Sequence, residues 1–213
     1  MRTIKQASLE SAITIKNILN RYRLKRRFHS VVTKWEKSGR ALPPPPEYKF
    51  LAVINYSKKN NHKVLIETGT YRGNMLLHVQ GFFDEIYSIE IQESLFLEAQ
   101  KLLRRFEHIH LVCGDSAVVL PDLVQNLGSP SLVWLDAHYS AGETGGQDEI
   151  QPILHELTCL LSSNLPHTIL IDDAKDFTGK DGYPTLKNVE KQVRTAQPNA
   201  AFEVKDNIVR IEL

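Results

Sequence analysis

Apolar residues recur at three- and four-residue steps over residues 8–37, the spacing that places side chains on one face of an α-helix. The apolar positions in the second half of this stretch are Leu24, Phe28, Val31, Val32 and Trp35. We expect Gly39 to end the helix and the four prolines at 43–46 to form a stiff spacer. The pattern therefore predicts a helical arm and linker over residues 1–46, followed by a body over residues 47–213.

Beyond the prolines, short apolar runs alternate with segments of helical periodicity. We expect strands at 63–67, 85–91, 108–113, 131–136 and 167–173. Alternation of strands and helices predicts an α/β fold, a mostly parallel sheet with helices on both faces. The dipeptide Asp206-Asn207 is a tight-turn signal, so the end of the chain should form a hairpin that adds an antiparallel strand, giving seven strands in all.

Composition narrows the class of protein. The chain is 42% hydrophobic and 24% charged, which is typical of globular domains and excludes wholesale disorder and collagen-like repeats. No apolar run approaches the roughly 18–20 residues of a membrane span, and no signal-peptide h-region is visible. Cys113 and Cys159 form no C-x-x-C motif, so we expect reduced, buried thiols in a cytoplasmic protein.

Charge is distributed unevenly along the chain. Residues 1–40 carry eleven Lys and Arg against two Glu, a net of +9, whereas the remaining residues carry 15 Lys and Arg against 23 Asp and Glu, a net of −8. We expect the apolar stripe of the arm to dock on the body and its basic face to remain solvated. Weak contact with an anionic surface and pairing with a second subunit in a homo-oligomer are the alternatives. The acidic body does not predict nucleic-acid binding.

Unusual residues lie where the first two predicted strands end, and ligands of parallel sheets bind beyond such ends. Glu67 ends the first strand, and Gly69 and Gly73 in the next turn allow close backbone approach and tight helix packing. Glu90 ends the second strand 21 residues after Gly69, which is the place of a ribose-hydroxyl ligand in dinucleotide-binding folds. A purely structural turn and an exposed strand-end Glu are the alternatives.

Carboxylates also follow the next three strands. Asp115 follows the third strand, where it could hydrogen-bond an adenine edge; Asp136 ends the fourth, and Asp172 and Asp173 end the fifth. Converging carboxylates repel one another unless a cation, a donor-rich ligand or protonation compensates. The oxygen ligands of Asp136, Asp172 and Asp173 suit Mg²⁺ or another divalent cation, although an Asp after a strand also serves as a helix N-cap.

The sequence lacks the characteristic motifs of several enzyme classes. The sequence contains no G-x-S-x-G of serine hydrolases and no P-loop of nucleotide hydrolases. His155-Glu156 lacks the second His of the zinc-protease H-E-x-x-H motif.

The motifs E-T-G-T-Y-R-G, S-I-E, G-D-S, W-L-D-A-H and L-I-D-D resemble those of class I S-adenosylmethionine-dependent methyltransferases, whose sheet is Rossmann-like and doubly wound. The first motif is similar to the E-x-G-x-Y-x-G turn of catechol-type, metal-dependent O-methyltransferases. Macrocin- and mycinamicin-type sugar O-methyltransferases share an acidic metal site. The resemblance covers about residues 60–213 and identifies the body as a methyltransferase domain using S-adenosyl-L-methionine.

The resemblance also implies roles for individual residues. The implied cofactor-binding residues are Glu67, Gly69, Thr70, Tyr71, Gly73, Glu90, Asp115, Ser116 and Asp136. Asp136, Asp172 and Asp173 would hold the divalent cation, which lowers the pKa of a substrate hydroxyl. His138 would accept the proton, because Tyr139 stands where the catechol enzymes carry their Lys base.

The expected activity is thus metal-assisted O-methylation of a small-molecule hydroxyl, with Asp136 and His138 in the catalytic centre. Two alternatives remain open at this point. One is a non-catalytic module that keeps the cofactor crevice. The other is a nicotinamide-dependent oxidoreductase, since Gly69 and Glu90 alone also fit that fold. The sequence does not distinguish a sugar hydroxyl, a phenol or a carboxylate as acceptor.

Overall fold

The computed structural model describes residues 2–136, 152–180 and 182–213 and contains a seven-stranded sheet of order β3-β2-β1-β4-β5-β7-β6. The strands are β1 Val64–Thr68, β2 Glu85–Glu90, β3 Ile109–Cys113, β4 Ser131–Leu135, β5 Thr168–Ile171, β6 Ala201–Lys205 and β7 Ile208–Glu212. Strands β1 to β5 are parallel, and β7 runs antiparallel to both β5 and β6. The predicted mostly parallel sheet with an antiparallel C-terminal hairpin is confirmed.

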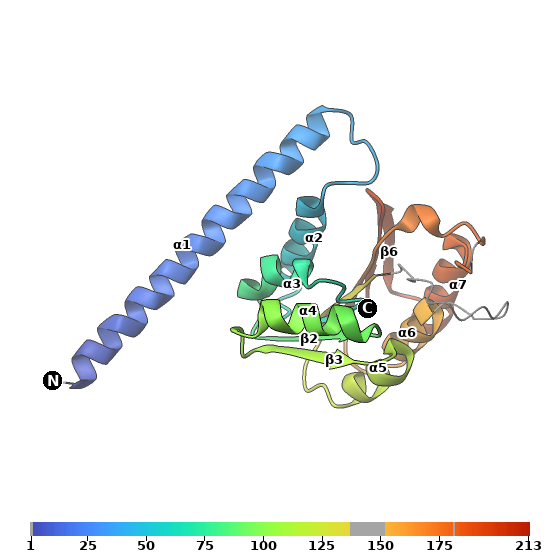
Figure 1. Cartoon of the computed structure of the whole chain (residues 1–213). Coiled ribbons are helices and arrows are strands. Elements are labelled where there is room, and N and C mark those ends of the chain that lie inside the picture. Colours follow the sequence, from blue (N-terminus) through green and yellow to red (C-terminus); the bar gives the residue numbers. More distant parts are fainter. Residues whose placement is uncertain (1, 137–151, 181) are drawn as a thin grey trace.

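Helices cover both faces of this sheet (Figure 1). One face is covered by α1 Arg2–Lys37, α2 Pro46–Lys59, α3 Asn74–Val79 and α4 Glu93–Leu103, and the other by α5 Ser116–Gln125, α6 Pro152–Leu161 and α7 Leu186–Ala196. Short 3₁₀ turns at Gln80–Phe82 and Ala174–Asp176 complete the described elements.

Two apolar cores lie on opposite faces of the sheet, because successive residues of a strand point to opposite sides. In β4, Val133 and Leu135 pack against α5, α6 and α7, whereas Leu132 and Trp134 pack on the face of α1, α2 and α3. All strand residues of β4 are buried, as expected for a central parallel strand. The two cores fix the carboxyl ends of β1, β2, β4 and β5 along one edge.

The sequence pattern predicts no element over residues 47–62, where the structure has helix α2. Pro46 occupies the first turn of α2, a position where its missing N–H costs no hydrogen bond. Phe50, Val53 and Ile54 are buried against the sheet. The proline run therefore ends at the start of a helix, and that helix brings Tyr48 and Lys49 toward the carboxyl edge of β5.

The predicted apolar stripe of the first helix packs on the body. Phe28 is 1% exposed and lies against the rings of Phe50 and His78, and Val32 belongs to the same core. Figure 1 shows that the N-terminal half of α1 extends away from the sheet. The second half of α1 therefore forms part of the body's core, while the division at residue 46 into arm and domain stays a prediction.

The structure also bears on the expectations about the cysteines and about membrane spans. Both cysteines are free thiols, but Cys113 is exposed at the end of β3, so the expectation that it is buried is wrong. Within the described residues, no helix is both long enough and apolar enough to span a membrane.

Candidate functional site

The turn between β1 and α3 approaches the end of β4 closely. Gly69 has φ 81°, and a Cβ there would lie 3.1 Å from the Asp136 Cβ, so only glycine fits without displacing Asp136. Gly73 has φ 72°, and a Cβ there would lie 2.9 Å from Leu103 Cδ1 on α4. Gly69 thus lies where the turn meets the end of β4, and Gly73 lies where it meets α4; their roles toward a cofactor stay predictions.

Glu90 at the end of β2 fixes this turn. Its Oε2 accepts a hydrogen bond from the Tyr71 backbone N–H at 2.7 Å, and its Oε1 accepts one from the Gln92 N–H at 2.9 Å. Tyr71 has φ 51°, a left-handed conformation that is uncommon outside glycine. Each carboxylate oxygen has a second lone pair, so Glu90 can hold the turn and still accept from ligand hydroxyls.

Glu67 is a buried acid at the end of β1, 2% exposed. The Ser88 hydroxyl donates to Glu67 Oε2 at 2.6 Å, and Ser88 Oγ lies 2.6 Å from Thr70 Oγ1. Burial raises the pKa of Glu67 to about 8, and the charges of Asp136 and Glu90 act in the same direction. Glu67 is therefore poised to gain from a cationic neighbour, which would favour its charged form.

Asp115, the acid that follows β3, also caps the next helix. Asp115 is exposed, and its Oδ1 caps α5 by accepting from the Ala117 N–H at 2.8 Å. Ser116 begins α5 and hydrogen-bonds Glu156, a 4% exposed acid of α6 that sequence reasoning did not assign to the site. Burial raises the pKa of Glu156, with Asp115 and Asp136 adding to the effect.

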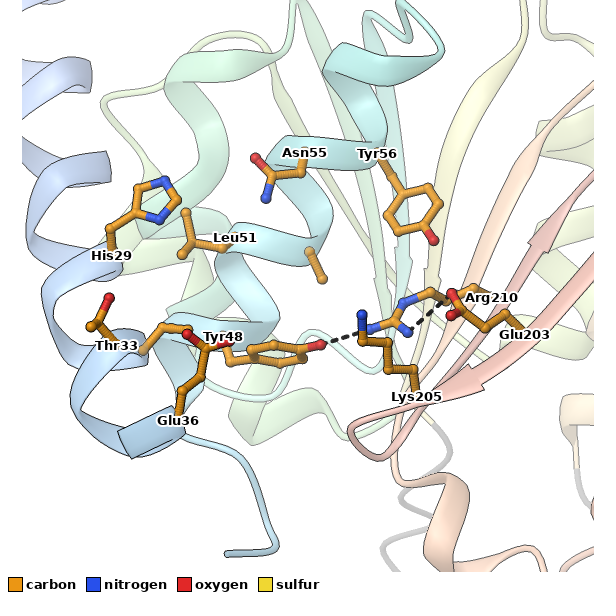
Figure 2. Close-up of a pocket in the computed structure, with 12 residues that line it drawn as sticks. His29, Thr33, Glu36, Tyr48, Leu51, Asn55, Tyr56, Glu203, Lys205 and Arg210 are labelled. Atoms are coloured by element: carbon orange, nitrogen blue, oxygen red, sulfur yellow. Dashed lines mark hydrogen bonds and ion pairs between the residues drawn. The ribbon is translucent and has the colours of Figure 1, made fainter. Parts of the chain in front are cut away.

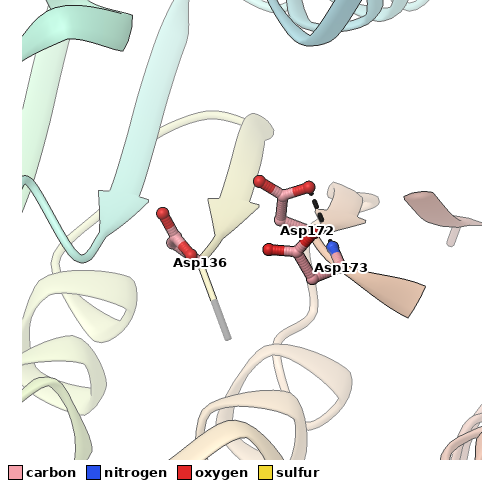
Figure 3. Close-up of side chains that lie close together, drawn as sticks. All are labelled: Asp136, Asp172 and Asp173. Atoms are coloured by element: carbon pink, nitrogen blue, oxygen red, sulfur yellow. Dashed lines mark hydrogen bonds between the residues drawn. The ribbon is translucent and has the colours of Figure 1, made fainter. Parts of the chain in front are cut away.

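The structure brings together the three aspartates of the predicted metal site. One ligand oxygen from each of Asp136, Asp172 and Asp173 lies within 4.8 Å of the others (Figure 3). Asp172 is 2% exposed and Asp173 is 3% exposed, and Asp173 has the left-handed φ of 51°.

A lysine that the sequence analysis missed reaches this cluster. Lys49 Nζ on α2 lies 2.5 Å from Asp172 Oδ2, and the Asp173 backbone N–H donates to Asp172 Oδ1 at 2.8 Å. Burial nevertheless raises the pKa of Asp172 to about 6, with Asp173 and Asp136 acting in the same direction and Lys49 opposing it. Asn207 Nδ2 donates to Asp173 Oδ1 at 2.7 Å.

The donor set fits a hard divalent cation, since three carboxylates converge within 4.8 Å. Lys49 changes the balance of charge, because its ammonium already neutralises part of the cluster. A cation at these residues would share Asp172 with Lys49 or displace it. No sequence signal linked Lys49 to Asp172, because the two residues are 123 positions apart.

His138, the predicted proton acceptor, and Tyr139 lie outside the described residues. The other predicted site residues lie along the carboxyl edge of β1 to β5. Thus the described site joins two groups of acids, Glu67, Glu90 and Asp115 on one side and Asp136, Asp172 and Asp173 on the other.

No protein-family model matches the sequence, and no curated protein matches it either. Solved structures do match its fold. The N-methyltransferase NodS from Bradyrhizobium japonicum WM9 is 10% identical with a TM-score of 0.56, over 78% of this chain and 95% of that one. NodS is also known in complex with S-adenosyl-L-homocysteine.

Two further methyltransferase structures show the same architecture. A Staphylococcus aureus protein assigned as a caffeoyl-CoA O-methyltransferase is 14% identical, with a TM-score of 0.54 over 92% of this chain and all of that one. The methyltransferase domain of bacterial CtHen1 is 16% identical, with a TM-score of 0.53 over 78% and 97% of the two chains. The chain has a class I methyltransferase fold.

Proposed function

We propose that this protein is an S-adenosyl-L-methionine-dependent methyltransferase that methylates a small-molecule hydroxyl with the help of a divalent cation. One observation carries the cofactor assignment: Glu90 closes the β1–α3 turn through the Tyr71 N–H at 2.7 Å, beside the buried acid Glu67. This arrangement places two carboxylates at the strand ends of a methyltransferase fold. They suit a ligand that carries both an ammonium group and ribose hydroxyls.

The residues of the turn would hold the cofactor as follows. Glu67 accepts from the amino group of its methionine part, Glu90 accepts from the ribose hydroxyls, and Asp115 accepts from the adenine amine. Gly69 lets the backbone come close to the ligand. When bound, the cofactor supplies an electrophilic methyl group on a sulfonium.

The aspartate cluster would serve the acceptor side. Asp136, Asp172 and Asp173 would hold the divalent cation, whose chemistry is to favour the deprotonated form of a nearby hydroxyl. The cation would compete with the Lys49 ammonium for Asp172. His138 keeps its proposed role as proton acceptor, and positioning of the acceptor would supply much of the acceleration.

Calorimetric titration tests the cofactor. We expect S-adenosyl-L-homocysteine to bind with 1:1 stoichiometry and NAD to give no heat under the same conditions. Binding of NAD alone would favour the oxidoreductase, and binding of neither would contradict the cofactor assignment. Because this measurement needs no acceptor, it is independent of the unknown substrate.

Chelation tests the cation. Once an acceptor hydroxyl has been found by screening, EDTA should abolish turnover while circular dichroism shows an intact fold, and added Mg²⁺ should restore it. Full activity in EDTA would remove the cation from the proposal. Binding of S-adenosyl-L-homocysteine without turnover of any sugar, phenol or carboxylate acceptor would favour the non-catalytic module.

A further inference from the structure

A cavity of about 320 Å³ lies between α1, α2 and the β6–β7 hairpin (Figure 2). This volume is in the range of small-molecule sites, roughly 300–1,000 Å³. Val32, Leu51 and Ala52 form its apolar wall, and Arg210 of β7 lines the opposite side. None of the residues assigned to the methyltransferase site lines this cavity.

Arg210 is a buried cation whose hydrogen-bonding capacity is largely unused. The residue is 5% exposed, and its Nε has no hydrogen-bond partner among the described residues. Its Nη2 donates to the Tyr48 hydroxyl at 2.8 Å, and its Nη1 lies 3.4 Å from Glu203 Oε2. A guanidinium has five N–H donors, so most of them lack a matched acceptor.

The acceptors that Arg210 does have are weak ones. The Glu203 side chain is 56% exposed, so solvent screens its charge, and 3.4 Å is long for a charge-assisted bond. Burial raises the pKa of Tyr48 to about 12, helped by its hydrogen bond to Asp206, so Tyr48 stays a neutral phenol. The Arg210 guanidinium also lies 6.0 Å from the centre of the Tyr56 ring, so its charge is partly compensated. A buried charge is costly unless it is fully paired, and an oxyanion in the cavity would complete the pairing.

The lining supplies further contacts for such a ligand. Lys205 adds a second positive charge beside Arg210. The carboxylates of Glu36 and Glu203 and the amide of Asn55 line the same space and can accept hydrogen bonds from hydroxyls. Figure 2 shows Lys205, Arg210 and Glu203 beyond the hydroxyl end of Tyr48 and Glu36 at its other end.

We propose that this cavity is a second ligand site, which binds a small hydroxylated oxyanion of the sugar-acid or sugar-phosphate class through Arg210 and Lys205. The oxyanion accepts from the Nη groups at the end of the Arg210 guanidinium and from the Lys205 ammonium, both of which line the cavity. The hydroxyls donate to Glu36 and Glu203. This assignment does not depend on the proposed methyl transfer, because no residue of the cofactor turn takes part.

Tryptophan fluorescence offers a direct readout. The Trp35 ring lies 5.1 Å from the Tyr48 ring, whose hydroxyl contacts Arg210, so a ligand on Arg210 should alter Trp35 emission. Glucuronate and glucose 6-phosphate are the probes, and neutral glucose is the control. We expect saturable binding of at least one anion with Kd on the order of 1 mM, and no saturation with glucose. Comparing the two anions decides between a carboxylate and a phosphate.

Variants test whether the change in Trp35 fluorescence comes from binding in the cavity. Arg210→Gln should weaken binding by more than about tenfold, and Arg210→Lys should restore only part of it, since lysine lacks the fork. Lys205→Gln changes an exposed side chain, so the fold should persist while binding weakens by about threefold. Lys191→Gln, on the exposed side of α7, is the matched control and should have no effect.

Saturating S-adenosyl-L-homocysteine in the same titration distinguishes the two sites. The anion should still bind, because the cavity lies apart from the cofactor turn. Absence of saturable binding by both anions would overturn the proposal, and so would binding that is unchanged in Arg210→Gln and Lys205→Gln. Neither outcome affects the cofactor assignment, and failure of cofactor binding leaves this result standing.

Discussion

The two groups of acids along the carboxyl edge of the sheet are stabilised in different ways. Glu67, Glu90 and Asp115 accept from neutral donors, a serine hydroxyl and backbone N–H groups. Within the described residues none of these three pairs with Lys or Arg. By contrast, Asp172 pairs with the ammonium of Lys49.

This difference has a chemical consequence. Neutral donors orient an acid without supplying a counter-charge, so the first group suits a ligand that brings hydrogen-bond donors and a positive charge. An ammonium neutralises its carboxylate, so the second group is already partly compensated before any divalent cation binds. The first group thus suits the proposed cofactor, and in the second group the proposed divalent cation would compete with Lys49.

The largest expected effect is on the first group. Glu90→Gln removes the charge and one acceptor while keeping the shape, and Gln cannot accept from both the Tyr71 and Gln92 N–H groups as well as the ribose. We expect S-adenosyl-L-homocysteine to bind about 100-fold more weakly by calorimetry. Glu93→Gln, at an exposed position three residues later, is the matched control and should leave the affinity unchanged. Equal affinities in both variants would contradict the ribose role.

The two groups also differ in how far the sequence predicts them. The partners of the first group lie 2 to 21 residues away, on neighbouring strands and turns. The fact that Glu67 and Glu90 end strands was therefore enough to predict where they lie. Lys49 lies 123 residues from Asp172, on a helix that the sequence did not predict, because the four prolines suggested an extended linker.

The sheet was predictable for a related reason. Apolar runs indicate where the strands lie. Because parallel strands must be joined by crossover connections, only a few arrangements of the strands in the sheet are possible. Glu156 and Arg210 were not predictable, because the sequence does not show which face of a helix or strand packs against elements that are distant along the chain. Such residues require the packed structure.

A smaller effect tests the competition in the second group. Lys49→Gln removes one positive charge from the aspartate cluster, so we expect its affinity for Mn²⁺, measured by electron paramagnetic resonance, to rise about tenfold. Lys175→Gln is the matched control, because the Lys175 Nζ is more exposed and 3.7 Å from Asp173 Oδ1. Its effect should be about twofold.

Two results would contradict this view of the second group. Unchanged or lower Mn²⁺ affinity in Lys49→Gln would show that the lysine and the cation do not compete. Undetectable Mn²⁺ binding in every variant would leave Lys49 as the counter-ion of the cluster and would argue for metal-independent chemistry.

A further effect concerns the pH dependence of stability that Glu67 imposes. Its pKa is raised from 4.5 to about 8, so between these values the folded state binds a proton that the unfolded state has lost. The free energy of unfolding should therefore fall as pH rises through this window, and Glu67→Gln should flatten that part of the curve in urea titrations. Ser88→Ala, which removes the neutral donor to Glu67, should keep the slope.

The same group should report on the cofactor. If the amino group of S-adenosyl-L-homocysteine binds beside Glu67, its positive charge favours the carboxylate, and the proton that Glu67 held at pH 7 is released. Calorimetry in buffers of different ionisation enthalpy should detect this release as a binding heat that varies with buffer, and the variation should vanish in Glu67→Gln. A buffer-independent heat in the unaltered protein would place the amino group away from Glu67. The contrast between the two groups would then rest on Glu90 and Asp115.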